Sequence, residues 1–126
     1  MKHEKAVVLF GHGARDPQWA EPMRRIRERL LAQAPGVAVE LAFLEFIAPA
    51  LHEAIDALVA EGVASITVIP VFLAQGGHLK KDVPVLIDAA RTRHPECAIH
   101  LTLAVGEADE VVEAIAGFAR SCVQAV

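Results

Sequence analysis

Four short apolar segments alternate with four segments of helical periodicity, and this alternation constrains the fold more than any other feature of the chain. The apolar segments are rich in β-branched residues, which is typical of buried strands. The helical segments repeat apolar residues every three or four positions, and glycine or proline stands at most of the junctions. The expected strands are Lys5–Phe10, Val37–Phe46, Ser65–Leu73 and Ala98–Val105, and the expected helices are Pro17–Ala34, Pro49–Gly62, Asp82–His94 and Asp109–Val123.

Strands that alternate with helices through short connections predict an α/β fold with one open, mainly parallel four-stranded sheet and helices on both faces. A chain of 126 residues can bury a core without disulfides, so we expect residues 1–126 to form a single domain. Pro70 cannot donate to a ladder and is expected near the end of its strand. Asp82, followed by Pro84, is expected to cap the third helix. Open sheets of this kind bind ligands beside the carboxyl ends of their strands.

Charge and cysteine content argue against several classes of protein. The formal net charge is −4, from 16 acidic and 12 basic side chains, which argues against a nucleic-acid partner. No apolar run approaches the ~20 residues that a membrane span requires, so we expect no membrane partner. Cys97 and Cys122 do not form a CxxC pair, and no apolar leader precedes the first strand. We therefore expect reduced thiols and a cytoplasmic location.

Three titratable residues follow three different strands of the expected sheet. His12 follows the first strand, Glu45 ends the second, and His78 lies in the loop after the third. The carboxyl ends of parallel strands share one edge, so we expect the three side chains to converge there. Two imidazoles and a carboxylate suit a divalent transition metal and leave coordination positions open for exchange. Each residue taken alone also fits a solvated loop.

Other chemistries of glycine-rich loops fit the segment GHGARD poorly. It lacks the third glycine of GxGxxG, and the chain contains neither GxxxxGK[ST] nor GxSxG. A histidine phosphatase would carry arginine directly before the histidine, where this chain has Gly11. Phosphoryl transfer stays only as a weak alternative.

Three segments, VVLFGHGARD, LAFLEFIAPAL and PVFLAQGGHLKKDVP, resemble the class II tetrapyrrole chelatases, specifically the small CbiX-type sirohydrochlorin cobaltochelatases. The resemblance runs from Val7 to Pro84, about two-thirds of the chain. It implies a flavodoxin-like or chelatase-like half domain. The implied activity is that of a lyase-type chelatase, which inserts a divalent metal as substrate, with no organic cofactor. Co²⁺, for cobalamin biosynthesis, is the expected metal, and Fe²⁺ for sirohaem or Ni²⁺ are the alternatives.

The resemblance also implies roles for individual residues. His12 and His78 match the family's metal-holding histidines, and Glu45 matches its acidic residue. Sirohydrochlorin is rich in carboxylates, so Arg15, Lys80 and Lys81, which flank the histidine loops, are candidates to bind it. The alternative for these three side chains is that they are solvated loop charges with no role in binding.

The chain also departs from the family's pattern. Ala14 stands where relatives often have serine, and the segment AVGEADE lacks the histidine-proline of many relatives, so we expect no site residue there. Because longer members carry two such domains around one cleft, we expect a homodimer. The alternative to a chelatase, from another functional class, is a protein that carries a metal or a tetrapyrrole without catalysing a reaction.

Overall fold

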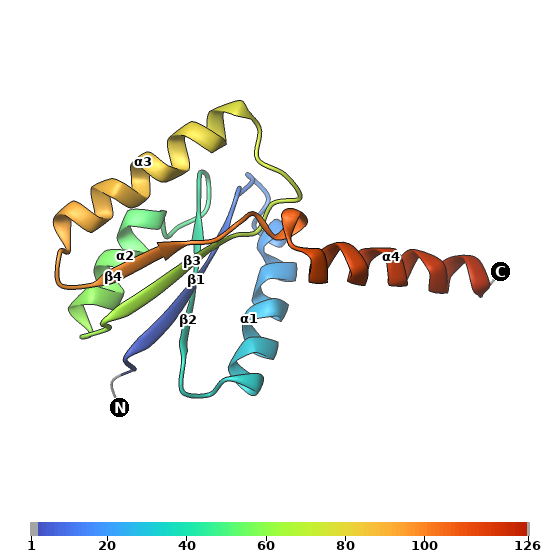
Figure 1. Ribbon diagram of the computed structural model, residues 1–126, viewed down its shortest axis with the longest axis horizontal. Coiled ribbons are helices and arrows are strands. Elements are labelled where there is room, and N and C mark those ends of the chain that lie inside the picture. The colour runs from blue at the N-terminus through green and yellow to red at the C-terminus, as the bar shows by residue number, and fades with distance from the viewer. Residues whose placement is uncertain (1–2, 126) are drawn as a thin grey trace.

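The computed structural model describes residues 3–125 and contains one sheet with helices packed around it (Figure 1). Its elements, in chain order, are β1 (Lys5–Gly11), η1 (Pro17–Ala20), α1 (Glu21–Gln33), β2 (Ala38–Phe43), α2 (Leu51–Ala60), β3 (Ser65–Pro70), α3 (Gly77–Arg93), β4 (Ala98–Leu101), η2 (Val105–Glu107) and α4 (Asp109–Gln124), where η denotes a 3₁₀ helix.

The four strands pair in the order β2-β1-β3-β4, and every pairing is parallel. This confirms the predicted open parallel sheet. Three strands end earlier than predicted. Pro70 is the last residue of β3, opposite Phe10, as expected for a residue that cannot extend a ladder.

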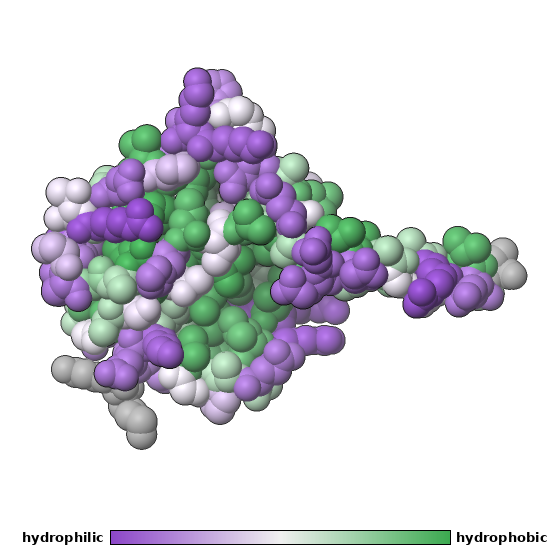
Figure 2. Space-filling model, in the orientation of Figure 1, coloured by the Kyte–Doolittle hydropathy of each residue, from purple (hydrophilic) through white to green (hydrophobic). Residues whose placement is uncertain are grey.

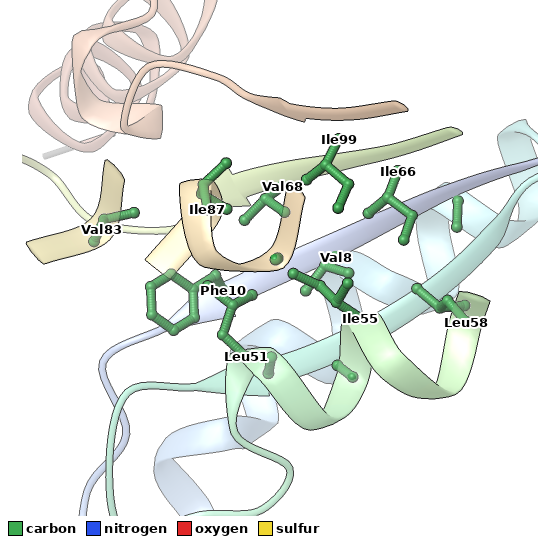
Figure 3. Close-up of a cluster of buried hydrophobic side chains, with 14 of the residues drawn as sticks. Val8, Phe10, Leu51, Ile55, Leu58, Ile66, Val68, Val83, Ile87 and Ile99 are labelled. Carbon is green, nitrogen blue, oxygen red and sulfur yellow. The ribbon is translucent and has the colours of Figure 1, made fainter. Parts of the chain in front are cut away.

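α2 and α3 cover the first face of the sheet and bury the larger core (Figure 3). Side chains alternate along a strand, so Val8 and Phe10 of β1 point to this face together with Ile66 and Val68 of β3. Ile55 of α2 packs against them and is fully buried. These contacts explain why the apolar runs in the sequence are nearly continuous.

α1 covers the second face over β1 and β2, so helices lie on both faces of the sheet, as predicted (Figure 1). Leu9 of β1 and Val39 of β2 form a smaller core with Met23 of α1. Arg27 also donates from Nε to the carbonyl oxygen of Val39 at 2.7 Å, which fixes α1 beside β2.

α3 begins at Gly77, and the prediction that Asp82 caps this helix is wrong. Asp82 lies inside α3, and so does Pro84, which has no N–H to donate within the helix. The helix still extends through both residues because Val83 and Ile87 lie on one side of it and are both buried in the core.

α4 points away from the sheet (Figure 1), and none of its residues is buried within the described part of the chain. None of the helices formed by residues 3–125 combines the length and apolar character needed to cross a membrane.

Candidate functional site

The glycine-histidine-glycine segment holds the first site loop against the segment that follows β2. Gly13 has φ of 90°, a conformation that side chains with a Cβ rarely adopt, and a Cβ there would overlap the carbonyl oxygen of Glu45. Leu44 N–H donates to the carbonyl of Gly11 at 2.9 Å, and Glu45 N–H donates to that of His12 at 3.2 Å. The β1–β2 pairing thus continues past the strand ends, and glycine at position 13 is required by both conformation and space.

This arrangement brings His12 and Glu45 together, as the strand-end pattern predicts. His12 Nε2 lies 3.3 Å from Glu45 Oε1, and the two side chains are 56% and 48% exposed. The His12 ring meets the edge of Phe72 with centroids 6.2 Å apart, and Phe72 in turn packs against Phe10 at 5.8 Å. The imidazole of His12 and the carboxylate of Glu45 are both open to solvent, and the phenylalanine rings support the imidazole from below. Together the two groups can offer two ligands to a transition metal or accept protons.

The turn after Glu45 carries backbone strain. Phe46 has φ of 66°, unusual for a bulky residue, and Ile47 N–H donates back to the carbonyl of Glu45 at 2.8 Å. The Arg15 guanidinium carbon lies 4.9 Å from the centroid of the exposed Phe46 ring, within cation–π range. Arg15 therefore bridges the two loops that carry His12 and Glu45.

An apolar groove of about 470 Å³ opens beside His12. Its lining residues are Gly11, His12, Gly13, Ala14, Trp19, Pro22, Met23, Phe43, Ile47 and Val71. Trp19 is 70% exposed, although its helical spacing with Met23 reads as part of a buried helix face. The sequence did not predict that Trp19 lines the groove. Helical periodicity shows which side chains share a face, but it does not show which of them the neighbouring loops leave exposed.

His78 does not join His12 and Glu45. It lies in the first turn of α3, not in a loop as predicted, and lines a separate hollow of about 300 Å³ with Gly77 and Lys81. Within residues 3–125 no three or more His, Cys, Asp or Glu side chains are grouped so that they could hold a metal. The three-residue metal site therefore stays a prediction, because only two of its three residues, His12 and Glu45, lie together.

The three basic candidates, Arg15, Lys80 and Lys81, lie in segments that follow the carboxyl ends of β1 and β3. Lys80 and Lys81 are exposed in the first turns of α3, and Arg15 is exposed in the loop after β1. None of the three takes part in an ion pair within the described chain. Their charges are thus available to an anionic ligand.

Comparison with known proteins gives one family. The CbiX family model matches residues 6–121. A curated relative, the sirohydrochlorin cobaltochelatase of Methanococcus aeolicus, is 36% identical over 83 residues, which cover 66% of this chain and 58% of the relative. The chain thus spans a little over half the length of this relative.

Two solved structures are also similar. A protein from Marinobacter aquaeolei VT8, described as a putative cobalamin (vitamin B12) biosynthesis CbiX protein, has a TM-score of 0.83 and 28% identity, with 97% of this chain and 99% of that chain covered. The sirohydrochlorin chelatase SirB from Bacillus subtilis subspecies spizizenii, solved in complex with cobalt, has a TM-score of 0.77 and 28% identity. That match covers 94% of this chain and 50% of SirB.

Proposed function

This chain belongs to the CbiX family, and from that premise we propose that it is a sirohydrochlorin chelatase that inserts a divalent metal, Co²⁺ in preference to Fe²⁺ or Ni²⁺, for cobalamin biosynthesis. The names of the Methanococcus relative and of SirB, together with the cobalt bound to SirB, support this proposal. The metal is a substrate of the reaction. We further propose a homodimer in the cytoplasm.

The observation that carries the proposal is the His12–Glu45 pair, whose histidine also lines an apolar groove. A tetrapyrrole is flat and apolar at its centre and charged at its rim. The groove beside His12 offers the apolar surface, while Arg15, Lys80 and Lys81 offer positive charge at the same edge of the sheet. This arrangement supports the proposal that the pair meets the centre of a bound ring.

Metal insertion exchanges two pyrrole protons for one divalent ion, so the site must both deliver the metal and take up protons. In the proposed mechanism, neutral His12 holds the ion through Nε2 and becomes free to accept a proton once the ring nitrogens have taken the ion. Glu45 shares the ion or relays the second proton to solvent, because its carboxylate is in contact with His12 and half exposed. His78 is proposed as a further ligand, supplied from α3.

Anaerobic visible absorption of sirohydrochlorin with Co²⁺, Fe²⁺ or Ni²⁺ tests the proposal. We expect the wild-type protein to metallate sirohydrochlorin faster than the spontaneous reaction. The acceleration should be about 100-fold smaller in His12→Ala, which is the lower end of the effect of removing a general base. Glu45→Gln and His78→Ala should also be slower. His3→Ala is the matched control, because His3 precedes β1 at the opposite edge of the sheet.

Two results would overturn the proposal. If sirohydrochlorin binds but metallation matches the blank, the chain is a carrier without catalysis. If His12→Ala and His3→Ala are equally active, the reaction does not pass through the His12–Glu45 pair.

A further inference from the structure

Trp19 is a large apolar side chain that the fold leaves in contact with water. It is the only tryptophan in the sequence, it is 70% exposed, and it lines the apolar groove together with His12. An aromatic side chain of this kind removes roughly 150–250 Å² from water when a ligand covers it. An exposed apolar surface beside a candidate metal ligand is typical of a binding site.

Contacts within the loop hold the backbone of Trp19 in place before a ligand binds. Asp16 caps η1: its carboxylate accepts from Gln18 N–H at 2.9 Å, and its carbonyl oxygen accepts from Trp19 N–H at 3.1 Å. Pro17 precedes Trp19 and Pro22 follows it, and both restrict the backbone further. Only the indole side chain is left to be ordered on binding, so the loss of conformational entropy is small.

The floor of the groove beside Trp19 is apolar and closely packed. Met23 and Phe43 line it and are only 7% and 4% exposed. A Cβ at Gly11 would overlap the Sδ atom of Met23, so glycine at this position makes room for the floor. The groove, of about 470 Å³, has the size of a small-molecule site. Its shape and lining match a flat apolar ligand.

Positive charge lies next to this groove, on the side of α1. A second hollow, of about 560 Å³, shares Pro22 with the groove and is lined in part by Arg25. Arg25 is exposed and takes part in no ion pair within residues 3–125, whereas Arg24 pairs with Glu21 at 3.1 Å. Figure 2 shows hydrophilic side chains gathered where α3 begins, the helix that carries the two lysine candidates. Charge around an apolar surface complements a ring with carboxylates at its rim.

We propose that Trp19 stacks on one face of the tetrapyrrole and that Arg25 binds a carboxylate at its rim. This inference rests on the proposed function and names the surface that binds its substrate. A ring with its centre at His12 covers the groove and lies against the indole, and stacked aromatic systems attract each other beyond the area they bury. The indole offers neither a metal ligand nor a proton acceptor. Trp19 is therefore a binding residue, which sets the affinity for the ring and not the rate of metal insertion.

The indole N–H of Trp19 reports contact with the ring directly. Because the chain has one tryptophan, the ¹⁵N-labelled full chain gives one indole resonance in a ¹H–¹⁵N spectrum. Metal-free sirohydrochlorin should move this resonance to lower frequency, since protons above the face of an aromatic macrocycle are shielded. Citrate, which has carboxylates but no ring, should leave it unmoved. Sirohydrochlorin that binds without moving the resonance overturns the proposal. So does a resonance that responds only to protein concentration, which would assign the groove to a second copy of the chain.

Substitutions separate binding from catalysis. By isothermal titration calorimetry, Trp19→Ala should weaken sirohydrochlorin binding about tenfold, and Trp19→Phe should restore most of that loss. In metallation, Trp19→Ala should raise KM with kcat unchanged, whereas His12→Ala should lower kcat. Arg25→Gln should weaken binding about threefold, as for one exposed ion pair. Arg29→Gln is the matched control, because Arg29 is an exposed arginine one turn further along α1 and, among the described residues, lines neither hollow.

The outcomes distinguish this inference from the proposed function. Equal affinities of the wild type and Trp19→Ala would overturn the stacking, and equal affinities of Arg25→Gln and Arg29→Gln would overturn the role of Arg25. A wild type that binds the ring against Trp19 but leaves metallation at the spontaneous rate would support the inference and contradict the proposed activity. A wild type that does not bind sirohydrochlorin would overturn both.

Discussion

Replacing Gly13 by alanine tests the contact that holds the two site loops together. At φ of 90° a residue with a Cβ loses about 1–2 kcal/mol relative to glycine. The Cβ would also overlap the carbonyl oxygen of Glu45, so the loops must separate and the hydrogen bond from Glu45 N–H to the His12 carbonyl is lost. That bond contributes about 1 kcal/mol. The expected loss in the free energy of unfolding is therefore about 2–3 kcal/mol.

Thermal unfolding followed by circular dichroism measures this loss. For a chain of this size we expect the Tm of Gly13→Ala to fall by roughly 10 °C. Gly36→Ala is the matched control, because Gly36 has no positive φ and nothing lies within 4 Å of a Cβ there. Its free energy of unfolding should stay within about 0.5 kcal/mol of the wild type. If Gly13→Ala were as stable as Gly36→Ala, the proposed close approach of the two loops would be refuted.

Three further substitutions have separate expected outcomes. Ile55→Ala should lower the free energy of unfolding in urea by about 2–5 kcal/mol, because Ile55 is fully buried between α2 and the sheet. Asp56→Asn should lower the Tm at neutral pH only slightly, because the Asp56 carboxyl is 45% exposed. The hydrogen bond with His94 holds the pKa of that carboxyl below its ordinary 3.8, so the stabilisation is present above that pH and is lost as the pH falls through the folded-state pKa. Arg15→Ala should raise the KM for sirohydrochlorin by about fivefold, as expected for one exposed ion pair.

Each of these expectations has a contrary result. A loss below about 1 kcal/mol for Ile55→Ala would mean that the site collapses around the missing side chain. A Tm difference for Asp56→Asn that persists unchanged at strongly acidic pH would show that the carboxylate charge is not its source. An unchanged KM for Arg15→Ala would leave Arg15 with its contact to Phe46 alone.

Much of the fold follows from local pattern, because the strands of this sheet are short apolar runs and parallel pairing is the expected result of alternating strands and helices. The start of α3 does not follow from pattern. Asp82 and Pro84 resemble a helix start, since aspartate caps helices and proline favours their first turn. Packing of Val83 and Ile87 in the core overrides this signal, and the glycines before His78 read as a loop although α3 begins at Gly77.

The same limit applies to the site. His12 and Glu45 could be predicted to meet because each stands at the carboxyl end of a strand, where neighbouring parallel strands share an edge. The position of His78 depends on where α3 begins, and the direction of α4 depends on the contact between Gly106 and Leu73. Both features are set by tertiary contacts between segments that are far apart in the sequence. Periodicity and spacing describe only neighbouring residues, so they do not predict such contacts.

A double-mutant cycle on Co²⁺ insertion tests the central claim that His12 and Glu45 act as one unit. The initial rates of metallation of sirohydrochlorin would be compared for the wild type, His12→Ala, Glu45→Gln and the double variant under anaerobic conditions. Because the two side chains are in contact, we predict that the double variant is no slower than His12→Ala alone, within about threefold. Losses that multiply in the double variant, or a wild type no faster than the spontaneous reaction, would contradict the claim.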